Sequence, residues 1–317
     1  MLKLTVRRLF YSLITLLIIA VVVFVAVELL PGDTATAYLG REATPQRLAS
    51  LRAELGLDRP AIERFARWFA GALRGDFGMS LARDKPVVDL IGVRLRNSLI
   101  LGLSAALIGI PLALGLGIIA GLTRDRAPDL WISTAALIAM TLPEFVTATF
   151  LILVFSISLQ LFPAVTVVPA NAPIMDLLPN LVLPIVTLTL IMVAHILRMV
   201  RTSVIDVMTS DYVQMAILSG VPYRRVVLRH ALPNALLPAI SITALTIGWL
   251  LGGLVIIEVV FNFPGLGTLL LDAIHTRDIP LVQGIALATA GVYVVVNLGA
   301  DVLTLMLNPR LRTLRTA

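Results

Sequence analysis

The chain has 317 residues, of which 58% are hydrophobic and 14% are charged. Soluble domains carry about 25% charged residues, so this composition excludes a single globule dissolved in water. The absence of cysteine excludes disulfides, thiolate nucleophiles and cysteine-based metal sites. The net charge is +6, but the basic residues gather at the ends of apolar runs, where membrane topology and lipid headgroups explain them. Membrane lipid is therefore an expected partner, and nucleic acid is not.

Six apolar runs follow one another along the chain. Because the hydrocarbon core of a bilayer is about 30 Å thick, a helix needs about 20 apolar residues to cross it. Runs of that length, bounded by charge or proline, predict spans at approximately residues 9–30, 98–122, 131–155, 181–200, 235–257 and 283–306. The first run is longer than the apolar core of a signal peptide and is interpreted as a retained anchor. We expect an all-α integral membrane protein with six transmembrane helices in one domain, residues 1–317.

The polar segments between these runs differ in charge. On the side that holds both termini, the short segments are rich in basic residues, namely Lys3, Arg7, Arg8, Arg124, Arg126, Arg198, Arg201, Arg224, Arg225, Arg229, Arg310, Arg312 and Arg315. By the positive-inside rule this side is the cytoplasm. Both termini are therefore expected in the cytoplasm.

The long segment 31–97 is expected on the opposite, extracytoplasmic side. Thr44 before Pro45 is typical of a helix N-cap and first turn, and Gly56 is typical of a helix end. A second helix is expected after Pro60. Apolar side chains recur along one of its faces, at Ile62, Phe65, Phe69 and Leu73. The segment therefore predicts a small helical cap after the first span.

The sequence lacks recognisable motifs for nucleotide binding, proteolysis and metal binding. A phosphate-binding P-loop needs a lysine after glycine, and neither Lys3 nor Lys85 follows one. No serine or aspartate pair in the spans has the partners that a membrane protease needs. The histidines are too scattered for a helical zinc site, at His195, His230 and His275. We expect no catalytic residue, no bound metal and no cofactor in this chain.

The cytoplasmic segment 201–234 has the pattern of a helix, a break and a second short helix. Ser203 with Asp206 forms a capping-box signature, and Gly220 is typical of a helix end. One stripe of the first helix is predicted at Ile205, Met208, Tyr212 and Met215. The second helix is expected to run from Pro222 and to end at Pro233, with a basic face at Arg224, Arg225 and Arg229. The pattern alone fits an amphipathic helix in the headgroups or a docking element for another protein.

This segment resembles a known docking loop. Permeases of ABC importers engage their ATPase subunits through a cytoplasmic loop. Five residues of this segment match that loop in order and spacing, namely Gln214, Ala216, Gly220, Leu232 and Pro233. Three positions depart from the usual loop, because Gln214 stands for Glu, Met215 for Ala and His230 for Ile. The missing glutamate charge puts one ATPase contact in doubt, and Asp211 is the neighbouring carboxylate that could supply it.

Other fragments extend the resemblance to the whole chain. It is similar to the permease family of dipeptide, oligopeptide and nickel importers through Leu30–Asp33, Glu54–Pro60, Gly75–Ser80, Glu258–Gly267, Arg277–Pro280, Asn297, Asp301 and Asn308–Arg310. The resemblance implies a pore-forming subunit of the bacterial inner membrane, driven by ATP hydrolysis in partners. The coupling residues that it implies are Asp211, Tyr212, Gln214, Ala216, Gly220, Arg224, Arg225, Arg229 and Pro233.

The same resemblance implies the partners. These are a second related permease, two ATP-binding subunits that hold ATP and Mg²⁺, and an extracytoplasmic solute-binding protein. Peptides are the default substrate, while nickel complexes, glutathione-like compounds and sugar conjugates stay open. Whether the second permease is a distinct chain also stays open. The competing interpretation is a stand-alone secondary transporter or channel, which would show inverted repeats that we do not find.

Ionisable residues within the spans are candidates for the transport pathway, because a charge at the bilayer centre costs about 2.5–3.5 kcal/mol on insertion scales. Three residues qualify: Glu144, His195 and Glu258. Small residues one helical turn apart favour close helix packing. Such pairs occur at Gly117 with Gly121 and at Gly248 with Gly252.

Overall fold

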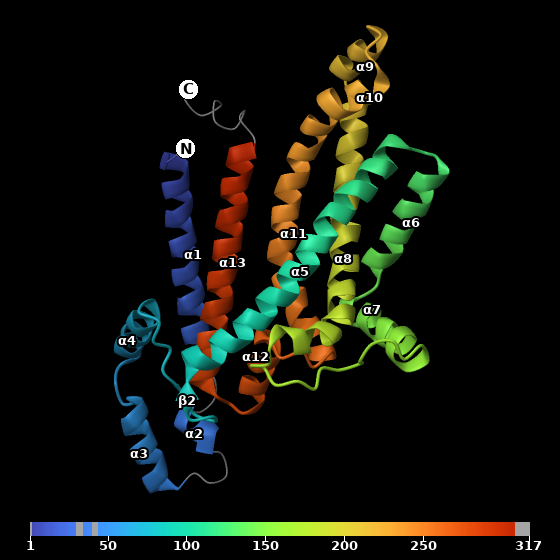
Figure 1. The fold of residues 1–317 in the computed structure, drawn as a ribbon. Coiled ribbons are helices and arrows are strands. Elements are labelled where there is room, and N and C mark those ends of the chain that lie inside the picture. Colours follow the sequence, from blue (N-terminus) through green and yellow to red (C-terminus); the bar gives the residue numbers. More distant parts are fainter. Residues whose placement is uncertain (1, 30–33, 40–43, 308–317) are drawn as a thin grey trace.

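The computed structural model describes residues 2–29, 34–39 and 44–307 and is built almost entirely of helices. Long helices run side by side in a bundle, with most of the shorter elements toward one end and α9 and α10 at the other (Figure 1). The first helix, α1 (Leu2–Glu28), begins at the same end of the bundle where the last, α13 (Ile279–Leu307), finishes. The fragments 30–33 and 308–310 lie outside the described residues.

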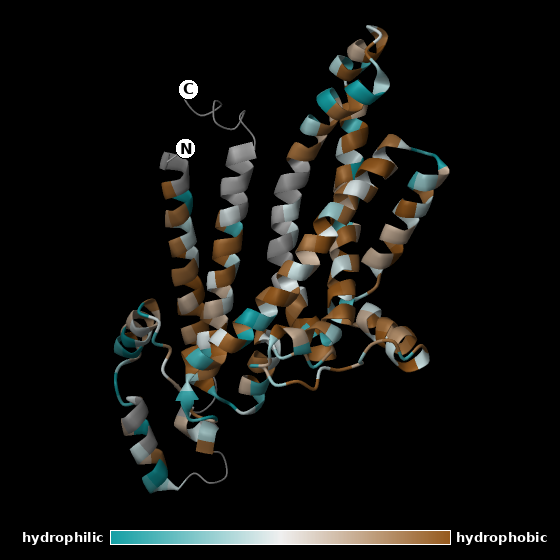
Figure 2. Cartoon of the chain, in the orientation of Figure 1, coloured by the Kyte–Doolittle hydropathy of each residue, from teal (hydrophilic) through white to brown (hydrophobic). Residues whose placement is uncertain are grey.

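Four helices in the described part of the chain are long and apolar enough to cross a membrane. They lie in α1, α5 (Val87–Leu122), α8 (Ile174–Met208) and α13. Apolar residues predominate along the described parts of these helices (Figure 2). A fifth candidate is a bent pair of helices, and α11 (Leu232–Val260) is a further apolar helix of 29 residues.

The bent pair corrects the predicted straight span at residues 131–155. Here α6 (Ala127–Thr141) is followed by α7 (Glu144–Leu151) and the π-helical η2 (Ile152–Ser158), and the two parts meet at 106°. The cause is local, because a proline disfavours helical geometry in the residue before it. Leu142, which precedes Pro143, is extended, with φ −84° and ψ 129°.

Two other spans are longer than predicted. Helix α5 begins at Val87, not near residue 98, and α8 extends beyond residues 181–200 at both ends. The prediction for α8 fails because it treats proline as a boundary, whereas Pro179 and Pro184 lie inside the helix. Neighbouring helices and local adjustments allow proline within membrane helices. Both helices therefore continue beyond the bundle without a break.

The segment after α1 contains α2 (Thr34–Leu39), α3 (Pro45–Leu55) and α4 (Ala61–Leu73), then a hairpin of β1 (Met79–Ser80) and β2 (Lys85–Pro86). The ends predicted for α3 are confirmed, since the Thr44 hydroxyl accepts a hydrogen bond from the Arg47 amide and Gly56 has φ +64°. Helix α4 rests on α1, where Phe65 meets Phe24 at a centroid distance of 5.4 Å. Arg64 and Glu28 form an ion pair between the same helices.

The core lies mainly between α5 and α8, and glycine makes their close approach possible. A Cβ at Gly117 would lie 2.6 Å from Cβ of Val200, and one at Gly121 would lie 2.7 Å from Cβ of Val204. The predicted packing role of this pair is confirmed. At Gly252 a Cβ would meet no described residue of this chain within 4 Å, so the predicted packing role of that glycine stays a prediction.

Candidate functional site

A short helix, α9 (Asp211–Leu218), is held at the tip of the bundle between α8 and α11 (Figure 1). Helix α8 continues to Met208, so the predicted helix start at Ser203 and Asp206 is wrong. The Ser203 hydroxyl instead donates a hydrogen bond to the carbonyl of Ala235 on α11, 2.7 Å away. The capping-box pattern fails because its serine serves helix packing, and α9 starts after Ser210.

Gly220 reverses the chain after α9, as predicted. Its φ of +77° is a left-handed conformation that glycine adopts without steric cost. The Gly220 amide donates to the carbonyl of Ile217 at 3.0 Å, and the Val221 amide donates to that of Ala216 at 3.2 Å. These bonds satisfy carbonyls at the end of α9 and fix the direction in which the chain leaves it.

The chain returns from α9 to the bundle through consecutive helical elements. Helix α10 (Tyr223–Arg225) passes into the π-helical η3 (Val226–Ala231) and then into α11. The prediction that Pro233 ends a helix is therefore wrong. Pro233 lies in the first turn of α11, where its missing N–H group costs little.

One face of α9 is buried and the other is exposed. Val213 is fully buried and packs with Val226 and Ala231, and Ala216 lies partly buried beside them. On the outer face, Tyr212, Met215 and Leu218 expose 47%, 63% and 80% of their surface. Large exposed apolar side chains at a protruding tip mark an interaction surface.

Polar contacts fix α9 to both of its neighbouring helices. The Gln214 amide donates to the carbonyl of Met208 at the end of α8, 2.8 Å away. On the α11 side, the Asn234 amide donates to the Tyr212 hydroxyl at 3.2 Å. A glutamate at position 214 could not make the first bond, because an ionised carboxylate only accepts. Glutamine at this position thus has a structural role that the sequence pattern does not indicate.

The remaining residues predicted for this loop lie at its surface. Asp211 is exposed in the first turn of α9, where a negative charge favours the helix dipole. Pro233 is exposed at the start of α11. The three arginines are exposed on α10 and η3, at Arg224, Arg225 and Arg229. The tip therefore combines exposed apolar and basic groups.

A buried ion pair, missed in the sequence, joins α6 to α8. The carboxylate of Asp129 accepts from Nε and Nη2 of Arg201, at 2.5 and 2.7 Å. It also accepts from the backbone amide of Asp125 and the hydroxyl of Ser133. Asp129 is only 1% exposed. The sequence marks Arg201 solely as a topology signal, since nothing local pairs it with a residue 72 positions away.

Two of the predicted pathway residues lie together. Glu144 occupies the first turn of α7, directly after the bend, and interacts electrostatically with His195 of α8. Its Oε2 atom is buried and has no hydrogen-bond partner in the described part of the chain. A Cβ at Gly253 of α11 would lie 2.6 Å from that oxygen. The bend thus brings a carboxylate against a glycine of α11.

The third pathway candidate, Glu258, has a different environment. It is fully buried near the end of α11. Its Oε1 accepts from the Ser98 hydroxyl at 2.5 Å and its Oε2 from the Gly267 amide at 2.6 Å. Ser98 in turn accepts from the Leu266 amide. Glu258 therefore ties α5 to the start of α12 (Leu266–His275), and this geometry does not favour the pathway role expected for it.

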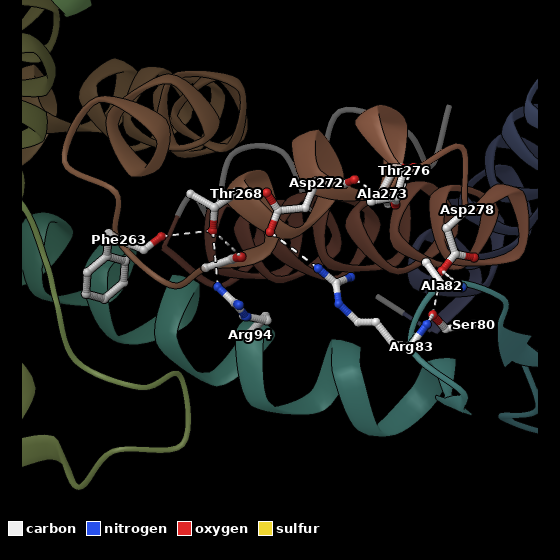
Figure 3. Close-up of polar contacts among 11 residues, drawn as sticks. Ser80, Ala82, Arg83, Arg94, Phe263, Thr268, Asp272, Ala273, Thr276 and Asp278 are labelled. Carbon is white, nitrogen blue, oxygen red and sulfur yellow. Dashed lines mark hydrogen bonds and ion pairs between the residues drawn. The ribbon is translucent and has the colours of Figure 1, made fainter. Parts of the chain in front are cut away.

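A second buried carboxylate organises the same end of the bundle. Asp278, before α13, is fully buried and accepts a hydrogen bond from the Ser80 hydroxyl at 2.5 Å. It also accepts from the Ala82 amide, which fixes the hairpin to the turn between α12 and α13. Figure 3 shows this contact beside a row of charged side chains between α5 and α12.

Long apolar helices, an ion pair that joins two of the helices and an amphipathic helix exposed at the tip are features of a multi-pass membrane protein. Residues 113–313 match the model of the binding-protein-dependent transport system inner membrane component, and residues 1–101 match the model of its N-terminal region. The chain belongs to this family. It is the pore-forming permease subunit of an ABC importer of the peptide type, and ATP hydrolysis takes place in partner subunits.

Curated relatives match over nearly their full length. The glutathione transport system permease protein GsiC of Shigella flexneri serotype 5b is 37% identical over 312 residues, which are 98% of this chain and 99% of that protein. The protein of the same name from Escherichia coli K12 is 36% identical over the same shares. This family membership leaves no support for a stand-alone secondary transporter or channel.

Proposed function

We propose that the chain crosses the inner membrane six times, through α1, α5, the α6–α7 pair, α8, α11 and α13 as one domain. The termini and α9 then face the cytoplasm, and the segment with α2, α3, α4 and the hairpin forms an extracytoplasmic cap. Two observations support this topology. The start of α1 and the tip of α9 lie toward the same end of the bundle (Figure 1), and both regions carry arginines, at Arg7, Arg8, Arg224, Arg225 and Arg229.

Helix α9 is proposed as the docking site of an ATPase subunit. The observation that carries this proposal is the exposed apolar face of Tyr212, Met215 and Leu218 on a helix whose other face is packed. Since α9 follows α8 after two residues and leads to α11 through α10 and η3, a displacement of the docked subunit would be transmitted to two spans. Four of the proposed coupling residues lie in α9 or end it, namely Asp211, Gln214, Ala216 and Gly220. The other residues, the three arginines and Pro233, lie on the neighbouring α10, η3 and α11.

The assembly that follows from this role contains two ATP-binding subunits, a second related permease and an extracytoplasmic binding protein. ATP and Mg²⁺ belong to the ATP-binding subunits, so this chain needs no cofactor. We propose short peptides as the substrate class and glutathione as the first compound to test, because the relatives bear that name. Glu144 and His195 are proposed to face the pathway, since the carboxylate has a buried oxygen without a partner in the described part of the chain.

Purification of the chain from its native membrane, with and without the change Gly220→Val, tests this proposal. Valine is strained at φ +77°, so it should distort the end of α9. We expect ATPase subunits to copurify with the native chain and to be lost, or to hydrolyse ATP without transport, in the variant. Gly75→Val is the matched control, because Gly75 has φ +82° and open space around it but lies far from α9. Equal behaviour of the two variants would contradict the docking role.

A further inference from the structure

A polar cleft opens at the end of the bundle opposite α9. Its volume is about 560 Å³, which lies within the range of small-molecule sites. One side is formed by Arg94 of α5, another by residues 166–170 before α8, and a third by Asn262, Thr268 and Asp272 around α12. Three segments distant in sequence therefore enclose one space.

The walls of this cleft are fixed by buried hydrogen bonds. Asn97 is fully buried, and its side-chain amide donates to the carbonyl of Ala170 at 2.8 Å and to that of Pro264 at 2.9 Å. The Thr166 amide donates to the carbonyl of Phe261 at 2.8 Å, and the Asn262 side chain donates to the carbonyl of Thr166 at 3.2 Å. A site with walls held in this way needs little ordering when a ligand binds.

The cleft presents one positive and one negative group. The guanidinium of Arg94 and the carboxylate of Asp272 both line it, from α5 and from α12 (Figure 3). They interact electrostatically. Their hydrogen bonds within the described part of the chain are long, since Arg94 donates to the Thr268 hydroxyl at 3.4 Å and Asp272 accepts from Arg83 at 3.4 Å. Each group therefore retains capacity for a closer partner.

We propose that this cleft is an entry subsite for short zwitterionic peptides. Arg94 receives the terminal carboxylate of the peptide, because a guanidinium matches a carboxylate with two parallel hydrogen bonds. Asp272 receives the terminal ammonium group, while Thr268 and Asn262 offer neutral hydrogen-bonding groups between them. The inference rests on the proposed function as a peptide importer and adds to it a site of selection in the permease itself.

The test uses the complete importer, with its binding protein, in proteoliposomes. Import of glutathione and of tri-alanine is measured first, and the better imported peptide is then compared with its C-terminally amidated and its N-acetylated forms. Because the binding protein is the same throughout, a change in the ratio between these forms must arise in the permease. Arg94→Ala should lower import of the free acid about tenfold relative to the amide. Asp272→Asn should lower import of the free amine in the same way relative to the N-acetylated form.

Arg96→Ala is the matched control. Arg96 lies on the same helix, does not line the cleft and donates only to the carbonyl of Ala172 among the described residues, so the ratios should not change. If Arg94→Ala lowers import of both forms equally, the cleft is a docking surface for the binding protein or a structural element, and the inference is wrong. It is also wrong if neither form is affected. Failure of the native importer to take up either peptide would contradict the proposed substrate class itself.

Discussion

The carboxylate of Asp129 holds the guanidinium of Arg201 through two hydrogen bonds of 2.5 and 2.7 Å, and this contact joins α6 to the part of α8 that leads to α9. Asp129 is 1% exposed and lies at the start of the helix that bends at Pro143. In the proposed docking role, a displacement of α9 would reach the bent pair through this contact as well as α11. Only the carboxylate of this pair is fully buried, since the Arg201 side chain is 27% exposed and keeps access to solvent.

The change Asp129→Ala is expected to destabilise the protein by about 2 kcal/mol, since it removes two charge-assisted hydrogen bonds to Arg201, whose side chain is 27% exposed. Thermal unfolding in mild detergent measures the effect. The exposed pair of Arg124 and Asp125, 3.2 Å apart, provides the control, and Asp125→Asn, which suits the left-handed backbone at φ 61°, should cost no more than about 1 kcal/mol. Similar losses of stability from both changes would show that the pair of Asp129 and Arg201 stabilises the protein no more than an exposed ion pair does.

Gly117→Ala is expected to destabilise the contact of α5 with α8. The new Cβ would lie 2.6 Å from Cβ of Val200 and 2.8 Å from the carbonyl oxygen of Leu197. Overpacking of this kind costs about 1–3 kcal/mol. Gly115→Ala changes the same helix where a Cβ meets nothing within 4 Å, so its unfolding temperature should equal or exceed that of the native chain. A native-like unfolding temperature for Gly117→Ala would contradict the close approach of the two helices.

Gln214→Glu should loosen α9 although it restores the residue usual in ABC permeases. The change removes the hydrogen bond to the Met208 carbonyl and places a negative charge beside it, at a cost of about 1 kcal/mol. Faster hydrogen exchange of the amides in residues 211–218 measures this loosening. Gln160→Glu is the matched control, because it makes the same change at an exposed residue outside α9. Unchanged exchange in Gln214→Glu would show that the bond does not hold the helix.

Gly253→Ala should reduce transport while leaving the assembly intact. A Cβ at this position would come within 2.6 Å of Oε2 of Glu144 and must displace the carboxylate. Gly252→Ala, one residue away, adds a methyl group where nothing lies within 4 Å. Transport in proteoliposomes should fall severalfold only in the first variant. Equal transport by both variants would remove the support for Glu144 as a pathway group.

Local signals in the sequence locate several features correctly. Thr44, Gly56 and Gly220 lie where their cap and turn chemistry indicates, because these roles depend on a few neighbouring residues. Proline leads to two opposite errors in predicting where helices end. Pro179 and Pro184 are contained in α8, where the surrounding bundle tolerates them, while Pro143 separates two helices that the sequence predicts as one.

Contacts between distant segments could not be predicted. Arg201 meets Asp129 across 72 positions, and Glu258 meets Ser98 across 160. Neither pair has a local pattern, since both depend on the way the helices pack. The sequence therefore indicates where α9 ends, at Gly220, but not where it begins, and it does not indicate the polar network within the bundle.

The 106° turn after α6 has a consequence for the surrounding bilayer. Helix α7 runs across the bundle direction, with exposed apolar side chains at Phe145 and Phe150 (Figure 1). In the proposed topology these apolar side chains are therefore available to lipid or to the second permease, at the point where the bent pair turns away from the direction of the span.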